Sequence, residues 1–191
     1  MIDNIKNIIP LLLFQKGNFY EVRVESPSNK MIKHYMIDSL EDLLSQYDEM
    51  KLLADNFNME VFIKLGAYSK EKLGFKILEV LSHKLQIKDL DYSDLLLQSI
   101  NDMNTIPKYW IVDVNVENVS NNDILRIKTI INDCEPNGRN VIADIPTPNG
   151  IHIITKPFNT NQFLLHQDVY YKVEVKKNNP TILYSNLNKN L

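Results

Sequence analysis

The alternation of apolar and polar residues predicts strands in both halves of the chain. Residues 19–25 (F-Y-E-V-R-V-E) alternate with a period of two, and residues 31–37 repeat this pattern after a turn-forming segment. We therefore expect these two segments to form a β-hairpin. Residues 58–65 predict a third strand, which Gly66 ends. Residues 108–116 (K-Y-W-I-V-D-V-N-V) begin with apolar residues on both faces, as expected of a central strand.

Segments with a helical repeat lie between these strands. Residues 38–42 (D-S-L-E-D) supply a cap and an acidic first turn for a helix that extends to about Ala54. A longer helix begins at Ser69. Its apolar residues share one face, which we expect to pack against the core: Leu73, Ile77, Val80, Leu81 and Leu85. Further helices are predicted at residues 93–103, 121–134 and 160–165.

This distribution of elements predicts an α+β fold. The remaining strands are expected at residues 140–145, 151–155, 169–175 and 181–184. We expect a mixed, mostly antiparallel central sheet with flanking helices in a single domain. Within it, residues 1–105 form an N-terminal αβ part, residues 106–185 form a motif-bearing sheet, and residues 186–191 form a polar tail that frays.

Composition and charge narrow the possible functions. Hydrophobic residues make up 44% of the chain, enough for a buried core, and the net charge of -3 gives no overall attraction for nucleic acid. Nucleic-acid binding would therefore need a local basic patch. The single cysteine, Cys134, excludes an internal disulfide and a cysteine-based zinc site. The apolar residues 8–14 are too few to span a bilayer and lack the features of a signal peptide, so we expect a cytoplasmic protein without a membrane partner.

Polar side chains interrupt one face of the strand at residues 108–116. Because side chains alternate along a strand, Asp113, Asn115 and Glu117 share one face and the intervening valines share the other. Oxygen ligands at this spacing suit a hard divalent cation such as Mg²⁺. The alternative is a strand that leaves the core at Asp113 and becomes solvated.

A second candidate site is the segment I-P-T-P-N-G-I-H-I-I-T-K, residues 145–156. Its two prolines stiffen the loop and Gly150 relaxes the backbone, so backbone N–H groups and the Thr147 hydroxyl can face an anion. His152 points to the same side as the loop and can bind phosphate, donate a proton or hold a metal ion. The alternative is an ordinary hairpin with a half-buried histidine.

A third candidate position is Glu174, which lies between two valines on a predicted strand and faces away from them. Its carboxylate can complete a metal site with Asp113, and the nearby Lys176 and Lys177 can meet phosphates. The alternative is a solvent-facing glutamate on an edge strand. Together the three segments offer carboxylates for a metal ion and donors for a triphosphate, which phosphoryl transfer requires.

The order of these segments resembles the archaeo-eukaryotic primase superfamily, the primase-polymerases. W-I-V-D-V-N resembles the first motif of that family, a hydrophobic strand that ends in Asp-x-Asp, with Asp113 in the first acidic place and Asn115 in the second. T-P-N-G-I-H, residues 147–152, resembles the turn that leads to the histidine of the second motif. Glu174, preceded by a valine, resembles the third motif. The resemblance covers roughly residues 108–184.

The resemblance implies an RRM-like catalytic core that transfers nucleotides from nucleoside triphosphates to make a primer on a DNA template. The catalytic residues would be Asp113, Glu174 and His152. The ligands of Mg²⁺ or Mn²⁺ would be Asp113, Glu174 and, more weakly, Asn115. The triphosphate contacts would be Thr147, Asn149 and His152, with phosphate charge steadied by Lys156 or Lys176. Such stand-alone proteins are common in phages and mobile elements, which implies a source of that kind and replication partner proteins.

Two other classes of function stay open. Asn115 replaces a charged metal ligand with a neutral one, which favours a catalytically inactive nucleotide- or nucleic-acid-binding relative. The acidic net charge and the presence of only three arginines favour a phage-type structural or host-interaction protein. The positions of Asp113, Glu174 and His152 discriminate between these classes. A shared pocket supports the enzyme and the inactive relative, whereas opposite faces of the sheet leave only the structural protein.

Overall fold

The structure is a computed structural model that describes residues 1–26, 31–89, 91–115, 119–166, 173–177 and 179–186. Its larger sheet contains β1 (Ile2–Asp3), β2 (Asn18–Glu25), β3 (Met31–Ile37), β4 (Glu60–Ile63), β5 (Tyr68–Ser69) and β10 (Thr181–Ser185). Its smaller sheet contains β6 (Trp110–Asn115), β7 (Val141–Thr147), β8 (Gly150–Thr155) and β9 (Val173–Lys177). The helices are α1 (Ile5–Ile8), a 3₁₀ turn (Ile9–Leu11), α2 (Leu40–Phe57), α3 (Lys70–Gln86), α4 (Leu95–Asn101), α5 (Asn121–Asp133) and α6 (Thr160–Leu164).

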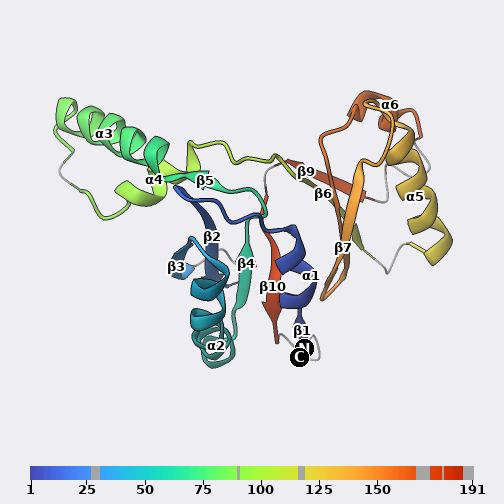
Figure 1. The fold of residues 1–191 in the computed structure, drawn as a ribbon, viewed down its shortest axis with the longest axis horizontal. Coiled ribbons are helices and arrows are strands. Elements are labelled where there is room, and N and C mark those ends of the chain that lie inside the picture. Colours follow the sequence, from blue (N-terminus) through green and yellow to red (C-terminus); the bar gives the residue numbers. More distant parts are fainter. Residues whose placement is uncertain (27–30, 90, 116–118, 167–172, 178, 187–191) are drawn as a thin grey trace.

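The described strand pairings are all antiparallel, so the predicted α+β class with antiparallel pairing is confirmed. The prediction of one central sheet is wrong, because the strands form two sheets that lie side by side (Figure 1). The larger sheet has the order β1-β10-β4-β2-β3, with β5 paired to β2, and the smaller has the order β7-β8-β6-β9. A hydrophobic pattern predicts strands but not how many sheets they form.

The smaller sheet and its helices follow one another along the chain as β6-α5-β7-β8-α6-β9. β6 and β7 both pair antiparallel with β8, so they run parallel to each other on either side of it. This is the β-α-β-β-α-β arrangement of ferredoxin-like domains. The helices cover one face of the sheet, where Ile127 and Ile131 of α5 and Phe163 of α6 are buried against Val112 and Ile153.

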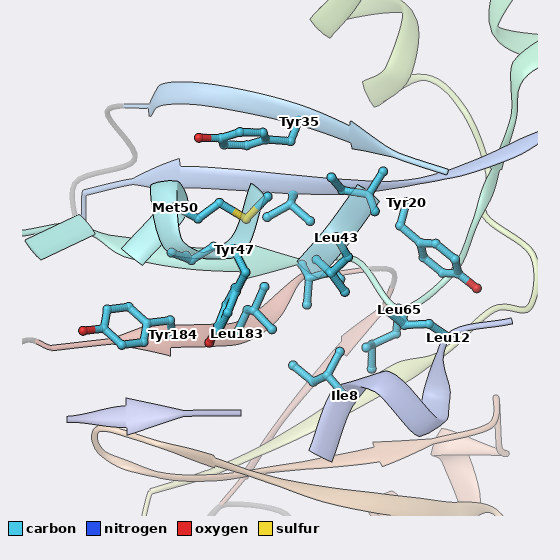
Figure 2. Close-up of a cluster of buried hydrophobic side chains, with 14 of the residues drawn as sticks. Ile8, Leu12, Tyr20, Tyr35, Leu43, Tyr47, Met50, Leu65, Leu183 and Tyr184 are labelled. Atoms are coloured by element: carbon cyan, nitrogen blue, oxygen red, sulfur yellow. The ribbon is translucent and has the colours of Figure 1, made fainter. Parts of the chain in front are cut away.

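The other face of the smaller sheet joins the main hydrophobic core. Ile111, Ile145 and Ile154 belong to the same buried cluster as the side chains of the larger sheet. On the larger sheet, α2 places Leu43, Tyr47 and Met50 over the strands, as Figure 2 shows. The Ser39 hydroxyl caps α2 by accepting the backbone N–H of Asp42 at 3.0 Å. The two sheets therefore share the main core, and the smaller sheet has a second hydrophobic cluster beneath its helices.

The last strand does not lie where the sequence pattern suggested. We expected residues 181–184 in the motif-bearing sheet, but β10 inserts between β1 and β4 of the larger sheet. All five residues of β10 are buried, so its pattern indicates burial without indicating a partner. The buried Asn4 amide links this strand to the smaller sheet by donating to the backbone carbonyls of Ile182 at 2.9 Å and Pro146 at 2.8 Å.

The helix predicted from Ser69 is present as α3, but its apolar face is only partly buried. Leu73 is buried, whereas Leu85 is 55% exposed because α3 projects from the body and packs mainly on α4 (Figure 1). Helical spacing predicts a helix without predicting how completely a neighbour covers it. Glu117 and the residues 187–191 of the predicted tail lie outside the described residues. Within the described part of the chain, no helix combines the length and apolarity needed to cross a membrane.

Candidate functional site

Three residues predicted from separate segments lie in one row across the smaller sheet. The register pairs Asp113 of β6 with His152 of β8 on one side and with Glu174 of β9 on the other. All three side chains therefore point from the same face of the sheet. Ile111 and Ile154, which share this face, belong to the main core, so the row faces the larger sheet. The arrangement on opposite faces, which would have left only a structural protein, is not observed.

His152 is held by contacts to both sheets. Its side chain is buried, and its Nδ1 atom lies 2.9 Å from the Oγ1 atom of Thr181 on β10. A hydroxyl can donate or accept, so this contact suits either tautomer of the imidazole. On the other side of the ring, Nε2 lies 3.6 Å from Oδ1 of Asp113. The larger sheet thus supplies the residue that orients the histidine of the smaller sheet.

Asp113 carries a stable negative charge. The imidazole of His152 and the ammonium of Lys176 lower the pKa of the Asp113 carboxyl to about 2, although its partial burial acts to raise it. The contact to His152 at 3.6 Å is longer than a hydrogen bond, so Lys176, whose Nζ lies 2.7 Å from Oδ2, is the better-defined partner. The same Nζ lies 3.3 Å from Oε2 of Glu174. One ammonium group therefore bridges the two carboxylates.

The site offers a limited donor set for a metal ion. Among the described residues, no three His, Cys, Asp or Glu side chains converge as metal ligands. Asp113 and Glu174 share one cation, the Lys176 ammonium, and Asn115 lies two residues along β6 on the same face. Two carboxylates and an amide fit a divalent ion that keeps water or substrate oxygens as its other ligands, provided that Lys176 moves aside. The Glu174 side chain is 72% exposed and has room to adjust.

The predicted turn residues separate into two groups. Thr147 and Asn115 both pair with Gly150, which lies between them in the sheet. Thr147 is therefore on the same face as Asn115 and Asp113, level with Asn115. Asn149 is exposed in the turn itself. Lys156 is exposed just beyond the opposite end of β8, so its predicted role in steadying phosphate charge stays a prediction. Four residues of extended chain separate Lys156 from His152 by about 13 Å.

A cleft of about 570 Å³ lies beside this row, between the two sheets. His152 and Lys176 line it from the smaller sheet, and Arg23, Glu25 and Phe62 line it from the larger one. Asp113 does not line the cleft, but it contacts both residues of the smaller sheet that do. The cleft thus places a cation from each sheet beside the histidine.

Arg23 is held at the cleft by a buried acidic residue. Its Nε atom donates to Oε1 of Glu21 at 2.5 Å, and its guanidinium also donates to Asn101 Oδ1 at 3.2 Å. Glu21 is 1% exposed and also contacts Nε2 of His34 at 3.1 Å and Nζ of Lys64 at 3.4 Å. Burial acts to raise the pKa of Glu21, but these cationic and hydrogen-bonding neighbours outweigh it and lower the pKa to about 2.

The sequence interpretation missed several of these contacts. The sequence does not indicate the contact of Thr181 with His152, because threonine is common in buried strands. Lys176 was expected to meet phosphate, and its pairing with Asp113 depends on a strand register that the sequence does not reveal. The sequence does indicate that Glu21 and Arg23 lie side by side, since both fall on one face of F-Y-E-V-R-V-E, a strand whose other face is apolar.

The assembled site contains an ionised carboxylate, a fixed imidazole and an ammonium group at the edge of a cleft with an arginine across from it. Such a set can hold an anionic ligand and exchange a proton with it. It can also hold a cation between Asp113 and Glu174. Comparisons of the chain with known protein families, curated proteins and solved structures gave no significant match.

Proposed function

We propose that the chain is a small primase-polymerase-like nucleotidyltransferase that uses nucleoside triphosphates, a divalent metal ion and a DNA template. The observation that carries this proposal is the row of His152, Asp113 and Glu174 on one face of the smaller sheet. These residues were singled out in three separate segments by their chemistry, and the order of the segments resembles that of the family's motifs. The β-α-β-β-α-β order around the row also supports the RRM-like core that the resemblance implies.

The cleft supports a nucleotide as the ligand. Its volume of about 570 Å³ suits a small molecule of that size. Arg23 and Lys176 line it and can bind phosphate oxygens, Arg23 through its planar guanidinium. His152 is buried and fixed by Thr181, so it can present Nε2 to a phosphate without losing much conformational freedom.

Asp113 and Glu174 would hold Mg²⁺ or Mn²⁺, with Asn115 as a weaker ligand. The ion would neutralise the charge that develops on the triphosphate during nucleotidyl transfer. The chain's own contribution is to keep Asp113 ionised and to restrict the imidazole of His152. Lys176, which bridges both carboxylates here, would then be free to contact phosphate.

A second function is favoured by the same contacts. Asp113 is paired with Lys176, and the neighbouring position on its face is the neutral Asn115, so the described part of the site offers two carboxylates to a metal ion. This favours a catalytically inactive relative that binds nucleotides through the cations of the cleft without turnover.

Thermal unfolding with and without Mn²⁺ and a nucleoside triphosphate tests for the ligand. A ligand that binds only the folded state stabilises it by about 2.7 kcal/mol at a hundredfold excess over its dissociation constant. We expect a metal-dependent rise in melting temperature in the wild type. It should be lost in His152→Ala and retained in His83→Ala, a control at an exposed histidine on α3.

Template-directed primer synthesis by the wild type and by Asp113→Asn then separates the two candidate functions. Synthesis that is lost in Asp113→Asn supports the enzyme. Metal-dependent nucleotide binding without any synthesis supports the inactive relative. The absence of any shift at millimolar ligand contradicts both functions and leaves the structural class.

A further inference from the structure

A second cleft surrounds the one tryptophan of the chain. Trp110 begins β6, and its side chain lies on the sheet face opposite that of Asp113. The cleft has a volume of about 400 Å³ and is lined by Asn104, Lys108, Trp110, Pro157 and Lys177. None of these residues takes part in the function proposed above.

The indole ring of Trp110 is anchored on one side and accessible on the other. Its ring meets that of Phe158 in an edge-to-face contact with centroids 5.5 Å apart, and Phe158 is buried beneath α5 and α6. Trp110 itself is only half-buried. Lys177, its partner across the strands, places Nζ 4.6 Å from the ring centroid. A cation–π contact at an exposed site is weak, so a planar ligand can displace the ammonium from the ring.

The charge around this ring is positive and uncompensated. Lys108 and Lys177 are exposed, and so is Lys156, which precedes Pro157 of the cleft. Within the described ranges, none of these three lysines pairs with an acidic side chain, whereas Lys70 pairs with Asp38. A chain of net charge -3 therefore carries a local basic patch around an accessible aromatic ring.

We propose that this cleft binds single-stranded nucleic acid, with a base stacked on Trp110 and the adjoining phosphates held by Lys108 and Lys177. Accessible aromatic rings flanked by unpaired cations are what sequence-tolerant binding of single strands requires. A duplex keeps its base faces covered by stacking, and an acidic peptide would use the lysines but leave the ring without a planar partner.

This inference deepens the proposed function by providing a place for a template strand, yet its observations do not depend on the Asp113 site. Trp110 lies three residues before Asp113 on the same strand, about 10 Å away, with its side chain on the other face. The two sites can therefore be tested separately.

Tryptophan fluorescence provides the direct test, because every change in the signal comes from Trp110. We expect a short oligothymidylate to quench the emission of the full chain at low salt. Lys108→Ala/Lys177→Ala should weaken binding and reduce the slope of log affinity against log salt by about 1.4, the value for two lost phosphate contacts on a single strand. Lys16→Ala, at an exposed lysine outside the cleft, serves as the control and should change neither quantity.

Binding measured by the anisotropy of a labelled oligothymidylate extends the test to the ring itself. Trp110→Ala should weaken binding roughly 5- to 150-fold, the range expected for the loss of one stacked base. Trp110→Phe, which keeps a ring against Phe158, should weaken it less, and it guards against a result that merely reflects misfolding. Asp113→Asn should bind the oligonucleotide like the wild type.

Several results would overturn the inference. These are no quenching at low salt, equal affinity in the double-lysine variant, and equal quenching by a duplex or by a polyglutamate peptide. Loss of oligonucleotide binding in Asp113→Asn would assign the strand to the other face of the sheet. Retained binding with no primer synthesis would uphold the inference while the enzymatic proposal fails.

Discussion

Replacing Glu21 with glutamine should strongly destabilise the protein at neutral pH. The side chain keeps its size but loses the charge that Arg23, His34 and Lys64 surround. These neighbours lower the pKa of Glu21 from 4.5 to about 2 despite its burial. At about 1.4 kcal/mol for each pH unit, the ionised carboxylate stabilises the folded state by about 3 kcal/mol. This agrees with the 3–5 kcal/mol lost, roughly, when one partner of a buried ion pair is removed.

The shifted pKa of Glu21 also predicts how the free energy of unfolding changes with pH. The pKa of Glu21 is lower in the folded chain than in the unfolded one, so its contribution is fully present above about pH 4.5. The contribution is lost as the pH falls from 4.5 to about 2, because the carboxyl is then protonated in both states. Urea unfolding across this range should therefore show Glu21→Gln less stable than the wild type near neutrality and approaching it at the acid end.

Glu71→Gln is the matched control, since Glu71 is exposed in the first turn of α3. Its free energy of unfolding should change by no more than about 1 kcal/mol, the usual size of a charge–dipole effect at a helix terminus. The reasoning is refuted if Glu21→Gln is as stable as the wild type near neutrality. It is also refuted if the deficit of the variant is constant across the acid range, because the loss would then not come from the charge.

Three further substitutions probe the geometry, each measured as the free energy of unfolding in urea. Thr181→Val removes the hydroxyl beside His152 and should lower the free energy of unfolding by about 1–3 kcal/mol. It should also reduce the rise in melting temperature caused by metal ion and triphosphate, and an unchanged rise would show that the hydroxyl does not orient the ring. Gly66→Ala would place a Cβ atom in steric overlap with the Thr105 side chain and the Pro107 carbonyl, so a loss of about 1–3 kcal/mol is expected, and a neutral result would contradict this close packing. Ser120→Ala removes the capping box of α5 and should cost about 1 kcal/mol, and equal stability would mean that water replaces the cap.

Local patterns predicted much of what the structure contains. The alternation in W-I-V-D-V-N correctly separated Asp113 and Asn115 from the valines, because side-chain direction in a strand depends only on position. The helix predicted at residues 121–134 is likewise present as α5, where Ile127, Ile130 and Ile131 are buried.

Features that depend on partners far along the chain could not be predicted. The ion pair between Lys176 and Asp113 depends on the register in which β9 pairs with β6. The contact of Thr181 with His152 depends on β10 joining the larger sheet, although β9, the preceding strand, belongs to the smaller one. The pairing of a strand depends on how the whole core packs and not on the sequence of that strand alone.

The insertion of β10 between β1 and β4 has a consequence for biosynthesis. When translation has reached residue 180, the residues of β1 and β4 have been synthesised, but those of β10, which lies between them in the sheet, have not. β1 pairs with β10, so β1 cannot take its place in the sheet until residues 181–185 have been translated. The larger sheet can therefore be completed only after residues 181–185 have been translated, and such distant pairings slow folding. Until then, the exposed edge of β4 is open to unwanted strand partners, which favours assistance from chaperones.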